Sequence, residues 1–365
     1  MSSIAYGGLD VHKESISAFV ICPETGAFVE DRIAFDMRKV RAAVKLWSKL
    51  GELRLCYEAS GTGFVLKRWL DELGIHCDVI APSLIPKVPG DRVKTDKRDA
   101  RKLAKLYSAG LLKVVRVPSE DDEAVRALLR LRENLTREVV RTKNRVIKYL
   151  RTLGHVYSGK ENWTKSHREW LRKLELGSVE KMVVDIYLEE LVEAEKHKEV
   201  VDKKIEEIAQ TEVYRSKVER LKCLKGVGTY TAMVALNEIG DPFRFAKAGQ
   251  VMSYVGLVPR EDSTGERRRT GPITKAGNSH ARWILAEAAW NQIRKGPGKR
   301  QQEHWKSQPM EVVEIAKKAQ ERLHKKFWSL AMRKDRNIAA TAVAREMVGF
   351  MWAILTVEVA TAQAA

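Results

Sequence analysis

The chain has 365 residues, of which 66 are Lys or Arg and 48 are Asp or Glu, so its formal net charge is +18. This length allows about two or three domains with a sizeable buried core. The basic excess favours a polyanionic partner, because each cation placed on a phosphate releases condensed counterions. Nucleic acid is the simplest such partner, although a solvated basic surface would give the same composition.

The cysteines and the apolar segments indicate the compartment. Four widely spaced cysteines form no CxxC pair and share no zinc-finger spacing with the histidines, which argues for buried thiols in a reducing compartment and against structural zinc. The first residues lack the basic leader and apolar run of a signal peptide. Residues 347–357, the longest uncharged stretch near the C-terminus, are too few to span a bilayer. We therefore expect a cytoplasmic protein with no membrane partner.

The N-terminal residues, 1–117, alternate between strands and helices. Strands are expected at residues 4–10, 15–21, 27–35, 53–58 and 75–82, and helices at 37–50 and 63–74. The order β-β-β-α-β-α-β predicts a mixed sheet with helices packed on it.

Four carboxylates occupy the positions that a metal site would need in such a domain. Asp10 ends the first strand, Glu58 ends the fourth, and Asp96 and Asp99 begin a helix in KTDKRDARKLA. Strand ends converge at the rim of a sheet where ligands bind, and hard cations such as Mg²⁺ prefer carboxylate oxygens. Two such ions about 4 Å apart stabilise both the attacking and the leaving oxygen of a phosphodiester exchange. The four residues predict a metal-dependent nuclease site of the RNase H-like (RuvC-like) type.

Residues 118–212 have a different pattern, rich in charged residues with apolar residues at regular spacing, and it predicts long charged helices. An acidic, capped helix start at residues 119–122 precedes a near-heptad of apolar residues, and a second charged helix is expected at 179–210. The apolar positions are Leu128, Leu131, Leu135, Val139, Val146 and Leu153. A coiled coil that pairs with another subunit and a solvated helical hairpin within one subunit explain this pattern equally well.

Residues 213–365 form the third segment and are expected to be mainly helical. In LKCLKGVGTYTAMVALNEIG, two short helices flank a turn at Gly226 and Gly228, which is the outline of a helix-hairpin-helix. Glycines in such a turn let backbone N–H groups approach a phosphate at a helix N-terminus. An ordinary αα-turn that needs glycine for its backbone is the alternative.

A basic loop follows a predicted helix at residues 243–256. Residues 258–300 contain ten Lys or Arg and four Asp or Glu, and within them Ser263 precedes Arg267, Arg268 and Arg269. A serine needs activation to act as a nucleophile, and arginines can neutralise charge on a phosphoryl transition state. Ser263 could equally be a turn residue.

Further donors and aromatic residues come next in the chain. Lys275 and Arg282 add donors on either side of a helix start near residue 278. Three tryptophans follow that could stack on bases but that helical spacing more often places in a core: Trp283, Trp290 and Trp305.

The motifs together resemble the DEDD transposases of bacterial insertion sequences, which have a RuvC-like N-terminal domain and a serine-bearing C-terminal domain. The resemblance covers nearly the whole chain. It rests on GLDVHKE, YEASGTG, KTDKRDARKLA, GVGTYTA and the segment from YVGLVPREDSTGE through GPITKAGNSHAR.

The resemblance implies a recombinase that excises and inserts its element. In that case Asp10, Glu58, Asp96 and Asp99 bind Mg²⁺, and Ser263 attacks DNA to form a phosphoserine link. It also implies a bridge RNA as guide in some members, a homodimer or tetramer assembled through the helical middle segment, and an active site composed by different subunits. The basic insert ERRRTG after Ser263 departs from the family pattern, so Thr264 and Ser253 stay open as alternative nucleophiles.

Two other functions remain open from the sequence. One is a metal-dependent endonuclease of the Holliday-junction type, in which water attacks and Ser263 only shapes a loop. The other is a nucleic-acid-binding protein without catalysis, against which the presence of all four carboxylates argues.

Overall fold

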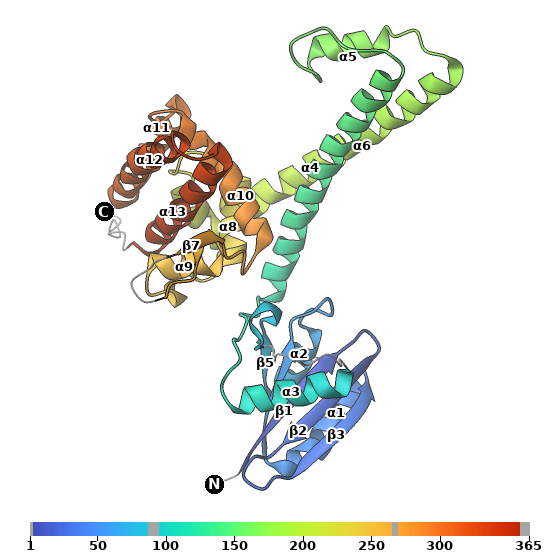
Figure 1. Ribbon diagram of the computed structural model, residues 1–365, viewed down its shortest axis with the longest axis vertical. Coiled ribbons are helices and arrows are strands. Elements are labelled where there is room, and N and C mark those ends of the chain that lie inside the picture. Colours follow the sequence, from blue (N-terminus) through green and yellow to red (C-terminus); the bar gives the residue numbers. More distant parts are fainter. Residues whose placement is uncertain (1–2, 87–94, 265–268, 358–365) are drawn as a thin grey trace. The chain divides into compact units, whose positions relative to one another are not determined.

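The computed structural model describes residues 3–86, 95–264 and 269–357, and the chain divides into two compact units, Met1–Ser119 and Glu120–Ala365 (Figure 1). The first unit contains a mixed five-stranded sheet, and the second is mostly helical. The predicted combination of an α/β domain with a helical remainder is therefore confirmed. We describe each unit by itself.

The sheet of the first unit has the strand order β3-β2-β1-β4-β5. Its strands are β1 Ile4–Val11, β2 Ser15–Ile21, β3 Phe28–Ala34, β4 Glu52–Glu58 and β5 His76–Ile80. The first three are antiparallel neighbours, whereas β4 runs parallel to β1 and β5 parallel to β4. All five strands lie where the sequence predicted them, because each is a short apolar or mixed run between turn residues.

Helices cover both faces of this sheet. The helical elements are α1 Met37–Trp47, α2 Val65–Glu72 and α3 Asp96–Ser108, with short 3₁₀ turns η1 Ser48–Leu50 and η2 Pro82–Leu84. Buried residues of α1 and α2, such as Trp47 and Leu70, pack against Leu9 and Leu55 of the sheet. Helix α3 packs on the opposite face, where Ala100, for example, joins a separate cluster.

Two long helices open the second unit and pack side by side (Figure 1). They are α4 Glu120–Thr152 and α6 Ser178–Ala209, with α5 Lys165–Arg172 in the connection. Arg132 pairs with Asp202 at 2.9 Å and Lys143 pairs with Glu195 at 2.7 Å, so the two helices are antiparallel. The predicted long helices are confirmed. The near-heptad describes their packing incompletely, because Leu131 is 46% exposed.

The rest of the second unit is a helical bundle with one small hairpin. Its elements are α7 Glu212–Leu221, α8 Thr229–Ile239, η3 Pro242–Arg244, α9 Ala248–Tyr254, β6 Pro259–Glu261, β7 Thr270–Ile273, α10 Ser279–Ala289, η4 Trp290–Ile293, α11 Lys299–Trp305, α12 Met310–Ala331 and α13 Arg336–Thr356. By length and composition α13 is, among the described residues, the one helix that could cross a membrane. However, 61% of its apolar window is buried, as in the core helix of a globular bundle.

Two local predictions in this region need correction. The helix predicted over residues 243–256 is present only as η3 and α9, because Asp241 caps a tight 3₁₀ turn by accepting from the backbone N–H of Phe243. The basic loop around Ser263 is a β-hairpin, formed by β6 and β7. The strands are too short to give a periodic signal in the sequence.

Candidate metal centre and serine hairpin

Asp10 and Glu58 come to the same edge of the sheet through strand register. In the parallel pair β1–β4, Leu9 lies opposite Tyr57 and Gly8 opposite Cys56, so Asp10 and Glu58 follow at the same level. Side chains alternate between the faces of a strand, and the Cys56 thiol lies 4.0 Å from the carbonyl oxygen of Leu103 in α3. Asp10 and Glu58 therefore share the face that α3 covers.

Gly8 allows α3 to lie directly on the sheet at this point. A Cβ atom at Gly8 would fall against the backbone oxygen of Ala100, 2.5 Å from the backbone nitrogen of Ala104 and 2.8 Å from the Cβ of Leu103. Only a glycine permits so close an approach of helix and strand. The contact fixes where the N-terminal turn of α3, which carries Asp96 and Asp99, meets the end of β1.

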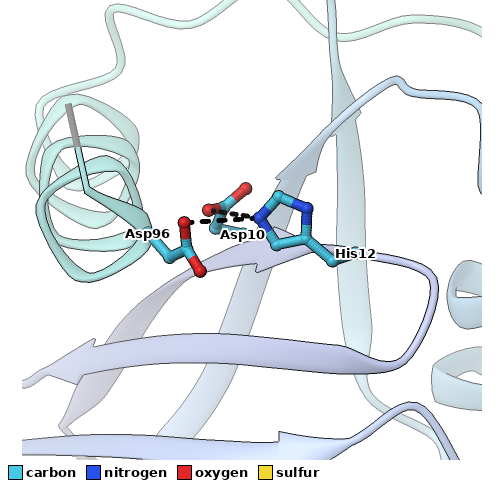
Figure 2. Close-up of side chains that lie close together, drawn as sticks. All are labelled: Asp10, His12 and Asp96. Carbon is cyan, nitrogen blue, oxygen red and sulfur yellow. Dashed lines mark hydrogen bonds and ion pairs between the residues drawn. The ribbon is translucent and has the colours of Figure 1, made fainter.

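Asp10, His12 and Asp96 converge at the resulting junction (Figure 2). The Nε2 atom of His12 lies 3.2 Å from Oδ2 of Asp10 and 3.5 Å from Oδ1 of Asp96. One ligand atom from each of the three residues lies within 4.8 Å of the others. Asp96 opens α3, and Thr95 caps that helix by accepting from the backbone N–H of Arg98. Asp10 and Asp96, two of the four predicted carboxylates, are thus brought together.

The electrostatics of this junction suit a cation. Burial raises the pKa of Asp10 above its ordinary value, and the charges of Asp96 and Asp99 raise it further, while His12 acts in the opposite direction. Like charges held close together without a counterion are unfavourable. A divalent cation with a preference for oxygen ligands would relieve that repulsion, so the residues fit an acidic metal site at Asp10, His12 and Asp96. Asp99 lies close enough for its charge to raise the pKa of Asp10. Strand register places Glu58 beside Asp10, at the same edge of the sheet.

His12 is the member of this cluster that we did not single out from the sequence. It lies in the same GLDVHKE motif, two residues after Asp10. In an extended chain, residues two apart point to the same side, and this spacing was the available signal. Imidazole is a less suitable ligand for Mg²⁺ than a carboxylate, so its contact with both aspartates is compatible with a positioning role.

Ser263 lies exposed in the β6–β7 hairpin of the second unit. Its hydroxyl donates to Oε1 of Glu261 at 3.0 Å and accepts from the backbone N–H of Arg269 at 3.3 Å. Thr264 is its exposed neighbour, and Ser253 is exposed in α9. Arg267 and Arg268 lie outside the described residues.

Close backbone contacts join the two ends of this hairpin, Gly256 against Ala276 and Gly277 against Tyr254. We call these four residues the hairpin base. A Cβ at Gly256 would fall 2.9 Å from the backbone nitrogen of Ala276, and one at Gly277 would fall against the backbone oxygen of Tyr254. Both glycines have positive φ, of +71° and +104°. The chain thus enters and leaves the hairpin at one place.

Lys275 and Arg282 contact the hairpin base. Lys275 has a φ of 55°, and its backbone N–H donates to the oxygen of Gly256 at 3.1 Å. Arg282 donates from Nη1 to the backbone oxygens of Val255 at 3.2 Å and Gly277 at 2.9 Å. Its guanidinium is therefore engaged with the protein backbone, and partial burial lowers its pKa.

Gly226 and Gly228 lie in the turn between α7 and α8 and have different surroundings. Gly226 has a φ of +82°, and a Cβ there would fall 3.0 Å from the Cβ of Asn291. That glycine is explained by backbone conformation and packing. Gly228 is the N-cap of α8 and has open space around it, which leaves the helix N-terminus accessible.

Comparisons with known proteins identify the family. Residues 218–305 match the family described as "Transposase IS116/IS110/IS902 family", and residues 7–154 match a transposase family of the DEDD, IS110 type. The chain is 39% identical to a putative transposase, y4qE, of Sinorhizobium fredii, over 96% of this chain and 88% of that protein. It is 35% identical to the transposase for insertion sequence element IS1533 of Leptospira borgpetersenii, over 92% of this chain and 99% of that protein.

The chain belongs to the IS110 family of transposases. The resemblance stated from the motifs is thereby confirmed, and the protein is an enzyme of DNA phosphoryl transfer that binds DNA. The DEDD-type match spans Asp10, Glu58, Asp96 and Asp99, and the second match spans Ser263. This IS110-family transposase therefore carries its two candidate sites in two separately matched regions.

Proposed function

We propose that this transposase cuts and rejoins DNA by attack of the Ser263 hydroxyl on a phosphodiester, at a Mg²⁺ site made by Asp10, Glu58, Asp96 and Asp99. The observation that carries the proposal is the convergence of Asp10 and Asp96 where α3 meets the end of β1. The strand order β3-β2-β1-β4-β5, with carboxylates at the ends of β1 and β4, supports an RNase H-like fold for this unit.

Mg²⁺, when bound, would supply charge stabilisation for the oxygens that attack and leave phosphorus. Ser263 would form the new O–P bond as the bridging P–O bond of the DNA strand breaks, which leaves a free DNA hydroxyl and a phosphoserine. The hydroxyl proton has a ready acceptor, because Ser263 already donates to Glu261. A base in hydrogen-bond contact is what a serine nucleophile requires. Reversal of the step on a second strand rejoins the DNA.

The partners follow from the same proposal. The accessible N-terminus of α8 at Gly228 supports a helix-hairpin-helix contact with a DNA phosphate. The antiparallel pair α4–α6 forms within one chain, as in the hairpin alternative. Assembly of two or four subunits through this segment therefore rests on the family resemblance. A guide RNA rests on the family resemblance, and an RNA-guided enzyme would read mainly backbone shape. A cytoplasmic location is part of this proposal.

A covalent trapping assay tests the nucleophile. The purified transposase is incubated with Mg²⁺, element-end DNA and RNA from the native host, then denatured and compared with Ser263→Ala, Ser263→Cys and Asp10→Ala variants. We expect an adduct with the wild type, none with Ser263→Ala, and a residual amount with Ser263→Cys because a thiol is also nucleophilic. Asp10→Ala is expected to bind DNA normally and to form no adduct. An adduct that persists in Ser263→Ala would move the role to Thr264 or Ser253.

One observation favours a second function, that of an endonuclease in which water attacks. The Ser263 hydroxyl both donates to Glu261 and accepts from the backbone of Arg269, as a residue that only shapes a turn would do. In that case the assay yields cleaved DNA without an adduct, and Ser263→Ala cleaves like the wild type.

A further inference from the structure

Basic side chains follow one line along α4. Arg130, Arg137, Arg141 and Lys148 are separated by 7, 4 and 7 residues and are all exposed. With about 3.6 residues per turn, the first and the last are five turns apart and the other two lie within roughly 20° of the same line. We call these four residues the α4 basic stripe.

The stripe lines two adjoining cavities between α4 and α10. The first cavity has a volume of about 500 Å³ and the second about 530 Å³, and Arg137 contributes to both. Besides the four stripe residues, their lining includes Arg145, Glu133 and Trp283. Five of these residues are basic and Glu133 is acidic, so the lining is strongly cationic.

The arginines of the stripe can exchange their present partners for phosphates. Arg130 pairs with Glu238, Arg137 with Glu133 and Arg141 with Glu138, and these arginine side chains are 51%, 62% and 60% exposed. The Arg141–Glu138 pair is exposed on both sides and contributes little to stability. Glu133 and Glu238 are buried, with side chains 8% and 3% exposed, so these two carboxylates need other partners when the arginines leave. In the part of the chain that the structure describes, Lys148 pairs with no carboxylate.

The buried carboxylates keep other partners when the arginines leave. His280 is buried, and its Nε2 lies 3.1 Å from Oε2 of Glu133 while its Nδ1 lies 3.5 Å from Oε1 of Glu238. Arg126 also pairs with Glu238, at 3.4 Å. Structural pairing of the carboxylates therefore does not require the stripe.

Trp283 lines a cavity beside the stripe, whereas Trp290 and Trp305 do not line either cavity. Its indole lines the first cavity and stacks on His280 at 6.2 Å with an interplanar angle of 21°. Trp290 packs against Phe327, and the indole of Trp305 donates to the backbone oxygen of Cys223. An apolar ring among cations suits a sugar-phosphate chain, which alternates apolar and anionic surface.

We propose that the α4 basic stripe binds the phosphodiester backbone of duplex DNA, with Trp283 against a deoxyribose. The stripe spans about 27 Å, since 18 residues rise about 1.5 Å each, which matches about eight base-pair steps at ~3.4 Å. Such contacts carry no sequence information and fix the duplex against the protein. The inference rests on the DNA phosphoryl transfer of the family, and it places a DNA-holding surface outside the carboxylate cluster and the Ser263 hairpin.

A salt titration of DNA binding tests the stripe. The triple variant R137Q/R141Q/K148Q is compared with K181Q/K196Q/K203Q, which removes the same charge from exposed lysines of α6. Full-length proteins bind a labelled duplex in EDTA, followed by fluorescence anisotropy across a salt series. We expect the stripe variant to bind about 10- to 100-fold more weakly at 0.1 M salt, with a log–log salt slope shallower by up to about 2.7, or ~0.9 per lost contact. The α6 variant is expected to stay near the wild type.

The outcomes separate this inference from the proposed function. Equal weakening in both triple variants would overturn the stripe, because the loss would then reflect net charge alone. A loss confined to an RNA duplex would overturn the assignment to DNA. Lys148→Glu, a single exposed change, repeats the test if the triple variant folds poorly. Under this inference, Asp10→Ala binds the duplex in EDTA like the wild type. The proposed chemistry is tested separately, by whether Asp10→Ala fails to form the protein–DNA adduct with Mg²⁺.

Discussion

Substitution of Gly8 by alanine is the sharpest test of how the fold positions the metal site. The new Cβ would lie 2.5 Å from the backbone nitrogen of Ala104, where carbon contacts need roughly 3.5 Å. Because the obstacle is helix backbone, α3 has to move away by roughly 1 Å. Overpacking of this kind costs about 1–3 kcal/mol of unfolding free energy. It also moves Asp96 and Asp99 away from Asp10, and a misplacement of roughly 1 Å can reduce catalysis about 100-fold.

Gly7→Ala is the matched control for this prediction. Its Cβ would point to the opposite face of the sheet, against the end of the Leu55 side chain and 3.2 Å from Cγ2 of Val20. Those side chains can adjust without moving α3. Urea unfolding and Mg²⁺-dependent adduct formation are measured for both variants. We expect both to lose stability and only Gly8→Ala to lose most of its activity. Wild-type activity in a destabilised Gly8→Ala variant would refute the argument that α3 positions the site.

The remaining predictions concern charge and the hairpin base. Because folding raises the pKa of Asp10, the folded protein is stabilised while Asp10 is protonated, and it loses that stability as pH rises through that pKa. Asp10→Asn should therefore raise the melting temperature in EDTA near neutral pH, with a gain that disappears in acid. Calorimetry that shows no gain would contradict this. Burial opposes ionisation of Glu238, but the His280 hydrogen bond and two arginines hold its pKa below 4.5. Glu238→Gln should therefore lower the free energy of unfolding, measured in urea, by about 2 kcal/mol at neutral pH. The loss should shrink as pH falls through that pKa. Arg282→Met should release the hairpin base, seen as faster exchange of the Lys275 backbone N–H that donates to Gly256, while Mg²⁺-dependent melting is unchanged.

The sequence predicted the sheet well because local patterns determine it. Short runs between turn residues, apolar in all strands but β3, located the five strands, and strand ends indicated Asp10 and Glu58. The approach of α3 was beyond such patterns, since it depends on Gly8 meeting the backbone of Ala100, 92 residues later in the chain. For the same reason the contact of His12 with Asp96 was missed.

In the second unit, the helices were predictable and the polar contacts between them were not. The 3.6-residue period marks a helix, but it does not say which charged residue turns inward. Glu133 and His280 are both buried and meet at 3.1 Å from different helices, a contact that neither local stretch of sequence indicates. The engagement of Arg282 with backbone oxygens likewise depends on a loop conformation set by Gly277.

The hairpin base bears on how such proteins diversify. Because Gly256 and Gly277 hold the two ends of the Ser263 hairpin together, residues added or removed at its tip leave the flanking helices where they are. Loop tips anchored in this way tolerate changes in length. Substitutions in the segment after Ser263 can therefore change its charge while the hairpin base and the elements that it joins keep their contacts.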